Sequence, residues 1–447
     1  MAKPTPLSGF PEFLPAERMV ETAVLDTLAS VFELHGFANI ETRAVEPMDQ
    51  LLRKGDTSKE VYVLRRLQEE DGGKDAGLGL HFDLTVPFAR YVLENAGKLE
   101  FPFRRYQIQK VWRGERPQDG RYREFAQADI DIVGAGELPV HHDLEIARVM
   151  LDALGRLEFL PGFTLQVNNR KLIQGFYAGL GIADLDETMR LIDKLDKLPV
   201  DAVRTQLVDA GLSEEQADRC LELATISSTD TSFVEKVRGL GVEHPLLDEG
   251  LQELADVVAG CAALVTDKVR ITADLKIARG LDYYTGTVFE TRLDGHEQLG
   301  SICSGGRYDS LASDGRTTYP GVGISLGVSR LLVPLVNRGA LLADRSVPSA
   351  VLVALTDEES RPASDALATL LRTSGVPCEV AASPQKFGKQ IRYAERRGIP
   401  YVLFSTEDGP QIKDIRSGEQ FAVDPASWTP PAEDLKPRIT TTQETNQ

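Results

Sequence analysis

Arginine and carboxylate side chains recur in two stretches of the sequence, residues 105–113 and 124–133, in which polar and apolar residues alternate. Because successive side chains of a β-strand point to opposite faces, this period predicts two strands with one polar face each. If the strands pair as a hairpin, their polar faces form one floor of guanidinium and carboxylate groups that includes Asp129 and Asp131. An antiparallel sheet with one hydrated face gives the same pattern, but two carboxylates beside arginines favour a binding site.

Arginines are the residues by which this chain could hold a nucleotide. The sequence has no phosphate-binding loop of the P-loop type, and Gly321–Gly327 is one residue too long for the dinucleotide-binding fingerprint. A planar guanidinium pairs bidentately with phosphate and stays protonated at neutral pH, so it can take the place of a glycine-rich loop. The candidate arginines are Arg113, Arg121, Arg123, Arg279, Arg307 and Arg330.

The composition is that of an ordinary globular protein. The chain has 447 residues, of which 42% are hydrophobic, and a formal net charge of −18. Its length suggests about three domains at ~150 residues each. Arg330 and Arg338 interrupt the longest apolar stretch, so no segment approaches the ~20 uncharged residues of a membrane span. The first residues lack the apolar core of a signal peptide, and we therefore expect a cytoplasmic protein without a membrane partner.

The cysteines and histidines do not indicate a metal site. The adjacent pair His141 and His142 lacks the four-residue helical spacing of a metal-binding pair. The cysteines are too widely spaced for a zinc or redox pair, and we expect buried free thiols. They are Cys220, Cys261, Cys303 and Cys378.

Changes in the period of the apolar residues divide the chain into segments. Helical spacing flanks the two strands, replaces strand patterns throughout residues 171–266, and gives way to strands again afterwards. After Pro348 strands alternate with helices, as in a small α/β domain, and the polar tail is expected to be disordered. The predicted parts are 1–170 and 267–345 as one core, 171–266 as a helical insertion, 346–428 as the α/β domain and 429–447 as the tail.

Four motifs resemble those of one enzyme family. Residues 113–125 are similar to motif 2 of class II aminoacyl-tRNA synthetases, and residues 323–331 are similar to their motif 3. Residues 278–290 and 304–309 resemble the two signatures peculiar to histidyl-tRNA synthetase. The resemblance runs in order from residue 9 to about residue 424.

The resemblance implies an α+β fold, in which helices flank the antiparallel sheet of the class II synthetases and a helical insertion and a C-terminal α/β anticodon-binding domain are attached. It also implies a homodimer. The implied reaction joins L-histidine and ATP to give histidyl-adenylate and pyrophosphate, and then transfers histidine to the 3′-terminal adenosine of tRNA(His). ATP is a substrate in this reaction, and Mg²⁺ normally accompanies it.

The resemblance further implies roles for individual residues. Arg279 and Arg113 are the expected catalytic residues, because a fixed guanidinium at the α-phosphate stabilises the charge that builds during in-line attack. ATP is expected to contact Arg113, Glu115, Arg121, Arg123, Phe125 and Arg330, with adenine between Phe125 and Arg330. Histidine is expected to contact Asp83, Thr85, Gln127, Asp131, Tyr283 and Tyr284. The tRNA is expected to contact Gln118 and a basic helical face made of Lys386, Lys389, Arg392 and Arg396.

Several alternatives remain open. Asp83 could be a turn or cap residue, since residues 81–90 are similar to the eukaryotic and archaeal branch and lack the glutamate of many bacterial members. The basic face could be a solvated helix surface. A regulatory paralogue that senses histidine, or a synthetase for another amino acid, would share parts of the pattern. The retained Arg113, Arg279 and Arg330, together with the α/β domain, favour the histidine enzyme.

Overall fold

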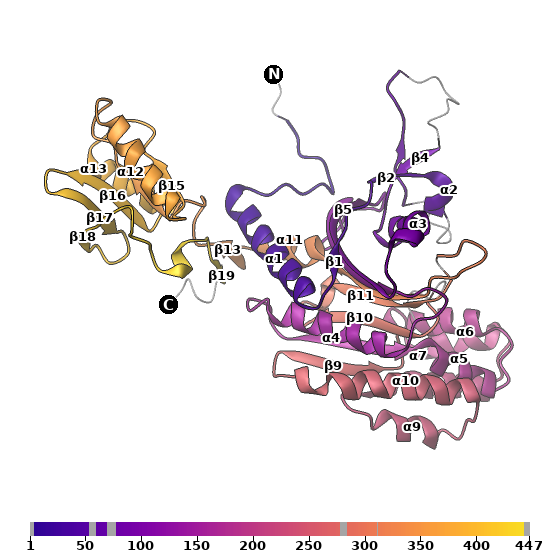
Figure 1. Ribbon diagram of the computed structural model, residues 1–447. Helices are drawn as coiled ribbons and strands as arrows, with labels where there is room; N and C mark the ends of the chain where they lie inside the picture. The colour runs from indigo at the N-terminus through magenta and orange to yellow at the C-terminus, as the bar shows by residue number, and fades with distance from the viewer. Residues whose placement is uncertain (1–3, 53–59, 69–76, 278–283, 311, 442–447) are drawn as a thin grey trace. The chain divides into compact units, whose positions relative to one another are not determined.

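Figure 1 shows a computed structural model that describes residues 4–52, 60–68, 77–277, 284–310 and 312–441. The chain divides into two compact units. The first comprises Met1–Pro11 and Leu25–Pro334, and the second comprises Glu12–Val24 and Leu335–Gln447. Among the described residues, no helix is long and apolar enough to cross a lipid bilayer.

A nine-stranded sheet forms the centre of the first unit. Its strands are β1 (Ala38–Asn39), β5 (Phe103–Trp112), β6 (Glu124–Val133), β7 (Phe163–Asn169), β8 (Ser227–Ser228), β9 (Val269–Asp274), β10 (Thr287–Leu293), β11 (Cys303–Tyr308) and β12 (Gly321–Gly327). They lie in the order β1-β5-β6-β12-β11-β10-β7-β9-β8, and every pair is antiparallel except β1–β5 and β7–β9. The predicted α+β fold with an antiparallel sheet is confirmed.

Strands β5 and β6 form the hairpin that the alternating sequence predicts. Arg105 lies opposite Asp131 and Gln107 lies opposite Asp129 in the observed register, so their side chains share one face. On the other face of β6, Ala128 and the isoleucines that follow it are completely buried. The period-two pattern therefore separates a polar floor from an apolar core, as expected.

Helices pack on the sheet face that lies away from the polar floor. Helix α4 (His141–Gly155) contacts β6 and β12, and helix α10 (Pro245–Cys261) contacts β7, β9 and α4. The two faces are distinguished by successive residues of β11, because Arg307 bonds to Asp143 of α4 whereas Tyr308 bonds to Asp131 of the floor. Buried apolar side chains of α4, among them Ile146 and Met150, complete this side of the core.

Helices dominate the segment in which the sequence predicts an insertion. They are α5 (Arg170–Gly179), α6 (Leu185–Ile192), η3 (Asp193–Asp196), α7 (Val200–Asp209), α8 (Glu214–Ala224), α9 (Phe233–Gly239), α10 and η4 (Ala262–Leu264). The sequence misses the short strand β8, which lies within this segment and pairs with β9. A strand of two residues carries too few side chains to show a period.

The remaining elements of the first unit border the polar floor or connect its strands. They are α2 (Met48–Leu51), α3 (Thr85–Asn95), η2 (Ala96–Lys98), η5 (Glu297–Leu299) and a three-stranded sheet of β2 (Val45–Pro47), β4 (Leu78–Leu80) and β3 (Val63–Leu64). Helices α1 (Pro15–Leu34) and α11 (Val328–Asn337) each contain one boundary between the two units, and a third boundary lies between Pro11 and Glu12.

The second unit contains a five-stranded sheet with the order β15-β14-β16-β17-β18. Its strands and helices are β14 (Val351–Val353), α12 (Arg361–Thr373), β15 (Cys378–Val380), α13 (Phe387–Arg397), β16 (Tyr401–Thr406), β17 (Gly409–Asp414) and β18 (Gln420–Ala422). Strand β14 is parallel to both β15 and β16, as the alternation of strands and helices predicts. The sequence misses β17 and β18, which add antiparallel strands to one edge.

The end of the chain differs from its predicted disorder. Strand β19 (Ile439–Thr441) pairs with β13 (Leu341–Ala343), and η6 (Ala432–Asp434) precedes it. Asp434 is only 4% exposed, and it accepts hydrogen bonds of 2.8 Å from the Tyr401 hydroxyl and from Arg416 Nη1. The expectation of disorder from residue 429 is therefore wrong for residues 429–441, because composition does not reveal partners that polar residues find elsewhere.

Candidate functional site

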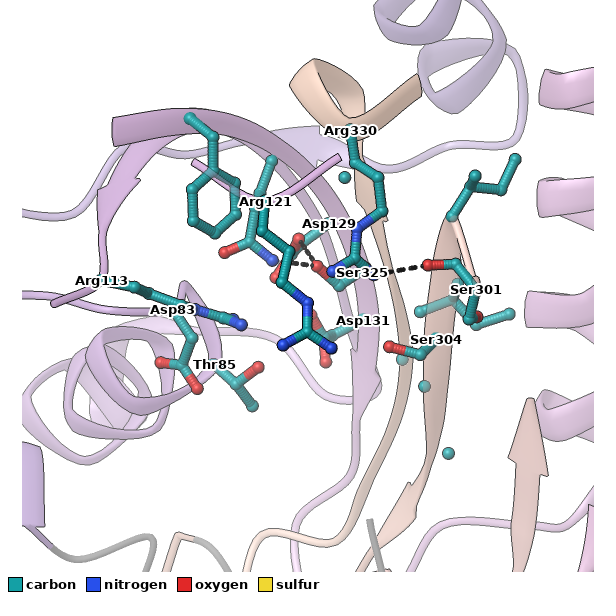
Figure 2. A pocket seen from close by; sticks show the side chains of 18 of the residues that line it. Asp83, Thr85, Arg113, Arg121, Asp129, Asp131, Ser301, Ser304, Ser325 and Arg330 are labelled. Atoms are coloured by element: carbon teal, nitrogen blue, oxygen red, sulfur yellow. Dashed lines mark hydrogen bonds between the residues drawn. The ribbon is translucent and has the colours of Figure 1, made fainter. Parts of the chain in front are cut away.

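A pocket lies over the polar floor of the first unit (Figure 2). Strands β6, β11 and β12 supply its base, and the loop between β5 and β6 and the start of α3 supply its walls. Figure 2 shows Asp83, Thr85 and Arg113 on one side of the pocket and Ser301 and Ser304 on the other. The lining residues that the sequence predicts are Asp83, Thr85, Arg113, Glu115, Arg121, Phe125, Gln127, Asp131, Tyr284 and Arg330.

Asp83 is both a helix-capping residue and part of the pocket. Its Oδ1 atom accepts a hydrogen bond of 3.0 Å from the backbone nitrogen of Val86 in the first turn of α3. A carboxylate at a helix N-terminus satisfies a backbone donor that has no partner within the helix. The alternative that Asp83 is a turn or cap residue is thus correct, and the same side chain also lines the pocket.

Three side chains at the rim offer an aromatic face and guanidinium groups. The Arg113 guanidinium carbon lies 5.2 Å from the centre of the Phe125 ring, and Arg113 Nε donates to Phe82 O at 3.0 Å. Arg330 is held by backbone oxygens, since its Nε donates to Gly120 O at 2.9 Å and its Nη1 donates to Ser301 O at 2.7 Å. Fixed guanidiniums beside an aromatic ring can hold the phosphates and the base of a nucleotide.

Arg121 and Arg123, which follow each other closely in the loop, point to different places. Arg121 lines the pocket, and its Nη1 lies 3.8 Å from a Glu115 carboxylate oxygen. Arg123 does not line the pocket, and its Nε donates to Glu115 O at 3.2 Å. The backbone of Gln118 bonds to that of Arg121 across the tip of the loop.

The charged side chains of the polar floor are buried and form ion pairs and hydrogen bonds with one another. Asp131 is 4% exposed; its Oδ2 lies 2.5 Å from Arg105 Nη2, and its Oδ1 accepts a hydrogen bond of 2.8 Å from the Tyr308 hydroxyl. The Arg105 side chain has no exposed surface, and its guanidinium carbon lies 4.3 Å from the centre of the Phe88 ring. A buried carboxylate held in this way can bind a cationic or N–H donating ligand without rearranging.

Asp129 is a second buried carboxylate of the floor. Burial raises its pKa to about 7; the nearby Asp131 and Asp83 charges act in the same direction, whereas Arg105 and a hydrogen bond from Ser325 oppose the rise. The pKa of this carboxyl group therefore lies well above the usual range for aspartate. Arg105 Nη2 lies 4.0 Å from Asp129 Oδ2 and so interacts with Asp129 less closely than with Asp131.

Arg307, a candidate for nucleotide binding from the sequence, lies on the other side of the sheet. Its Nε and Nη2 atoms donate to Asp143 Oδ1 at 3.0 and 2.7 Å, and Nη1 donates to Leu138 O at 3.0 Å. Its position on β11 places it opposite in phase to Tyr308, so it faces α4 and does not line the pocket. The interpretation of Arg307 as a phosphate ligand is therefore wrong.

Two predicted site residues, Arg279 and Tyr283, lie outside the described residues.

In the second unit, Lys389, Arg392 and Arg396 are exposed on α13 and border one hollow together with Gln385 and Glu395. Lys386 is exposed immediately before α13 and does not border that hollow.

Some pocket residues were not predicted as site residues. Tyr308 lies within the signature at residues 304–309, and Ser325 lies within the motif 3 match, so each had a signal in the sequence. The alternating pattern predicts Asp129 as a carboxylate of the floor, but it does not indicate a role for this residue. Ser301 had no signal, because it joins the pocket only through the pairing of distant strands. Among the described residues, no three histidine, cysteine, aspartate or glutamate side chains are grouped to hold a metal ion.

Comparisons with known proteins identify the kind of chain to which this pocket belongs. A family model described as histidyl-tRNA synthetase matches residues 9–331, and a model of an anticodon binding domain matches residues 349–427. A histidine–tRNA ligase of Cutibacterium acnes is 60% identical over 453 residues, which cover 98% of this chain and 99% of that protein. A histidine–tRNA ligase of Micrococcus luteus is 57% identical over 461 residues, with 99% and 100% covered. The crystal structure of histidyl-tRNA synthetase from Nostoc sp. PCC 7120 superposes with a TM-score of 0.84 at 35% identity, covering 95% of this chain and 97% of that one.

Proposed function

The chain belongs to the histidyl-tRNA synthetase family, whose activity is histidine–tRNA ligation with ATP as a substrate, and from this premise we propose how its residues perform the reaction. One observation carries the proposal: a single pocket brings buried carboxylates of the floor together with guanidiniums and an aromatic ring at its rim. The floor suits the ammonium and imidazole groups of histidine. The rim suits the phosphates and the adenine of ATP.

Histidine binds with its ammonium group at Asp83, Thr85 and Gln127. Asp83 and Gln127 are 4% and 7% exposed, so both offer their oxygens in surroundings that exclude water. The imidazole lies against Asp131 and Tyr284, with Tyr283 close by. A site that pairs both ring nitrogens rejects amino acids that cannot form these hydrogen bonds, by a factor of about 10⁴ or more.

ATP binds across the rim. Phe125 and Arg330 hold the adenine ring, Arg113 contacts the α-phosphate, and Arg121 and Glu115 act at the distal phosphates. Arg123 does not line the pocket and receives no phosphate in this proposal. The two backbone hydrogen bonds of Arg330 support its part, because they hold the guanidinium plane in place before ATP arrives.

Adenylate formation follows from these positions. A carboxylate oxygen of histidine attacks the α-phosphorus, the new oxygen–phosphorus bond forms in line, and pyrophosphate leaves with the electron pair of the broken bond. No general base is required, since the nucleophile is already a carboxylate. Arg113 and Arg279 stabilise the charge that builds on the α-phosphate oxygens.

Mg²⁺ accompanies ATP in this proposal. Mg²⁺ keeps several waters and uses one or two carboxylates besides the phosphates, and the partly exposed Glu115 carboxylate in the pocket fits that need. The ion would neutralise phosphate charge. The protein side chains alone would not retain it.

The second step takes place where the tRNA reaches the same pocket. A hydroxyl of the 3′-terminal adenosine of tRNA(His) attacks the carbonyl carbon of the adenylate, and AMP leaves with the electron pair. We assign Gln118, at the tip of the β5–β6 loop, to the acceptor end of the tRNA. The exposed Lys386, Lys389, Arg392 and Arg396 are assigned to its anticodon region.

Four of the five segments predicted from the sequence serve as the domains of this proposal. Residues 1–170 and 267–345 form the catalytic core, and residues 171–266 and 346–428 form the insertion and the anticodon-binding domain. The protein acts in the cytoplasm as a homodimer. Sedimentation of the purified chain measures its oligomeric state.

Arg279→Ala tests the catalytic assignment. If the Arg279 guanidinium acts mainly in the transition state, single-turnover adenylate formation slows by orders of magnitude while the Kd for histidine changes little. Equal losses of rate and of histidine affinity would remove Arg279 from the catalytic role.

A further inference from the structure

A chain of hydrogen bonds links Gln127 to Asp129 through Ser325. Gln127 Nε2 donates to Ser325 Oγ at 2.5 Å, and Ser325 Oγ donates to Asp129 Oδ1. Ser325 lies directly opposite Asp129 in the pairing of β12 with β6, and Gln127 is two residues away from Asp129 on the same strand face. Figure 2 shows Ser325 and Asp129 together at the base of the pocket.

The direction of these bonds determines which atom of Gln127 faces the ligand. A serine hydroxyl has only one proton. While Asp129 is ionised it can only accept, so the hydroxyl proton points to Asp129 and the serine oxygen accepts from the Gln127 amide nitrogen. The Gln127 carbonyl oxygen must then lie on the other side of the amide.

Several buried side-chain atoms of the described residues have no hydrogen-bond partner, and among them the Gln127 carbonyl oxygen is the one whose residue lines the pocket. Gln127 is 7% exposed, and its Oε1 accepts no hydrogen bond from any residue that the structure describes. A buried acceptor without a partner is costly unless a ligand supplies the donor. An ammonium group in the pocket supplies that donor.

We propose that Asp129 is a positioning residue for histidine binding, which acts through Ser325 to turn the carbonyl oxygen of Gln127 toward the ammonium group of the substrate. This inference rests on the proposed contact between Gln127 and that ammonium group. A protonated Asp129 can donate to Ser325, and the serine proton is then free to bond to Gln127 Oε1. The amide can turn over, and its NH₂ group would then face the ammonium.

The surroundings of Asp129 place this change in the physiological pH range. The charged and titratable groups that face it are Arg105 of β5, Asp131 of β6, Asp83 before α3 and Cys303 of β11. Arg105 favours the ionised form, whereas burial and the two carboxylates favour the protonated form and bring the Asp129 pKa to about 7. The productive orientation of Gln127 is therefore populated above pH 7 and lost as the pH falls below it.

Kinetics of ATP–pyrophosphate exchange with the full-length chain test the chain of hydrogen bonds. Ser325→Ala removes the link, and we expect the KM for histidine to rise about tenfold to a hundredfold, the effect of one hydrogen bond to a charged group. The KM for ATP and kcat should change little. Ser325→Thr keeps the hydroxyl and should restore the histidine KM.

Ser329→Ala is the matched control. Ser329 of α11 is also buried, and its hydroxyl accepts from the backbone nitrogen of Ala126 of β6, the strand that carries Gln127. Ser329 does not line the pocket. We expect an unchanged histidine KM. An equal rise in Ser329→Ala, or an unchanged KM in Ser325→Ala, would overturn the proposal.

The pH dependence of kcat/KM for histidine tests whether the charge of Asp129 matters, since Asp129→Asn keeps the shape of the side chain and removes its charge. In the unsubstituted enzyme kcat/KM for histidine should fall below pH 7, approaching about tenfold per pH unit, because this ratio reports ionisation of the free enzyme and substrate. Asp129→Asn cannot titrate, so it should retain only the part of the fall that belongs to the substrate imidazole. An identical profile in Asp129→Asn would contradict the proposal.

Gln127→Ala distinguishes a failure of this inference from a failure of the site assignment. If the histidine KM rises in Gln127→Ala and not in Ser325→Ala, Gln127 binds histidine but is positioned without Asp129. If Gln127→Ala leaves the histidine KM unchanged, the assignment of Gln127 to the ammonium group fails, and the positioning role of Asp129 falls with it.

Discussion

The floor of the pocket and the basic face of α13 both concentrate charge, yet they hold it in opposite ways. In the floor, Arg105 is fully buried and Asp131 is 4% exposed, and their closest atoms are 2.5 Å apart. On α13, Lys389, Arg392 and Arg396 are exposed. Buried charges interact strongly but must be paired, whereas exposed charges are screened by salt.

The difference matches what each region has to recognise. A small amino acid must be distinguished from others of similar size, which requires fixed, dehydrated partners. A polynucleotide offers many phosphates, and exposed cations bind them through the release of counterions. A net charge of −18 is compatible with such binding, because affinity depends on local patches of charge.

Arg105→Leu should produce the largest effect on stability. It leaves Asp131 buried without its cation, and removing one partner of a buried ion pair costs about 3–5 kcal/mol. Denaturant unfolding of the full chain measures this loss. The matched control is Arg104→Leu, since Arg104 faces the other side of β5 and forms a partly exposed pair with Glu145. That pair should contribute about 0–1 kcal/mol, and equal losses in the two variants would contradict the contrast.

Combined replacement of Lys389, Arg392 and Arg396 by alanine should weaken tRNA binding and leave adenylate formation unchanged. If each contacts a phosphate of single-stranded tRNA, the slope of log affinity against log salt should decrease in magnitude by about 2. The control replaces Arg361, Arg372 and Lys413 by alanine. These three substitutions remove the same positive charge from α12 and β17 of the same unit. If both triple variants lose the same affinity, the α13 face is only a solvated surface.

Modification of the cysteines should have the smallest effect on activity, and it compares the burial of the two units. Cys303 of β11 is 2% exposed and does not line the pocket, and burial and the charge of Asp129 raise its pKa. Cys378 of the second unit is half-buried, and Arg372 opposes the rise of its pKa. A thiol reagent should therefore modify Cys378 first in the native protein, with little change in adenylate formation. Prior modification of Cys303, located by mass spectrometry, would show that the buried core around β11 is open to solvent.

The sequence predicts the floor better than the contacts that cross it. Strict alternation along β5 and β6 determines which side chains share a face, and the observed register agrees. The same reasoning cannot reveal that Ser325 meets Asp129, because 196 residues separate them and only the pairing of β12 with β6 joins them. Arg307 fails for a related reason, since its residue type suits phosphate but its phase on β11 turns it toward α4.

The second unit shows the same limit. Its parallel strands and helices follow from their periods, whereas β17, β18 and the ordered tail depend on pairing and on partners such as Arg416. Short strands carry little periodic signal. A polar tail also has the composition of a disordered segment until its partners are known.

ATP–pyrophosphate exchange, measured with each of the twenty amino acids separately and without tRNA, tests most directly whether the pocket activates histidine. Exchange with histidine alone is the expected result, because only histidine offers an ammonium group and two ring nitrogens to the same set of partners. Exchange with another amino acid, or none in protein that still binds histidine, would contradict the assignment of the pocket.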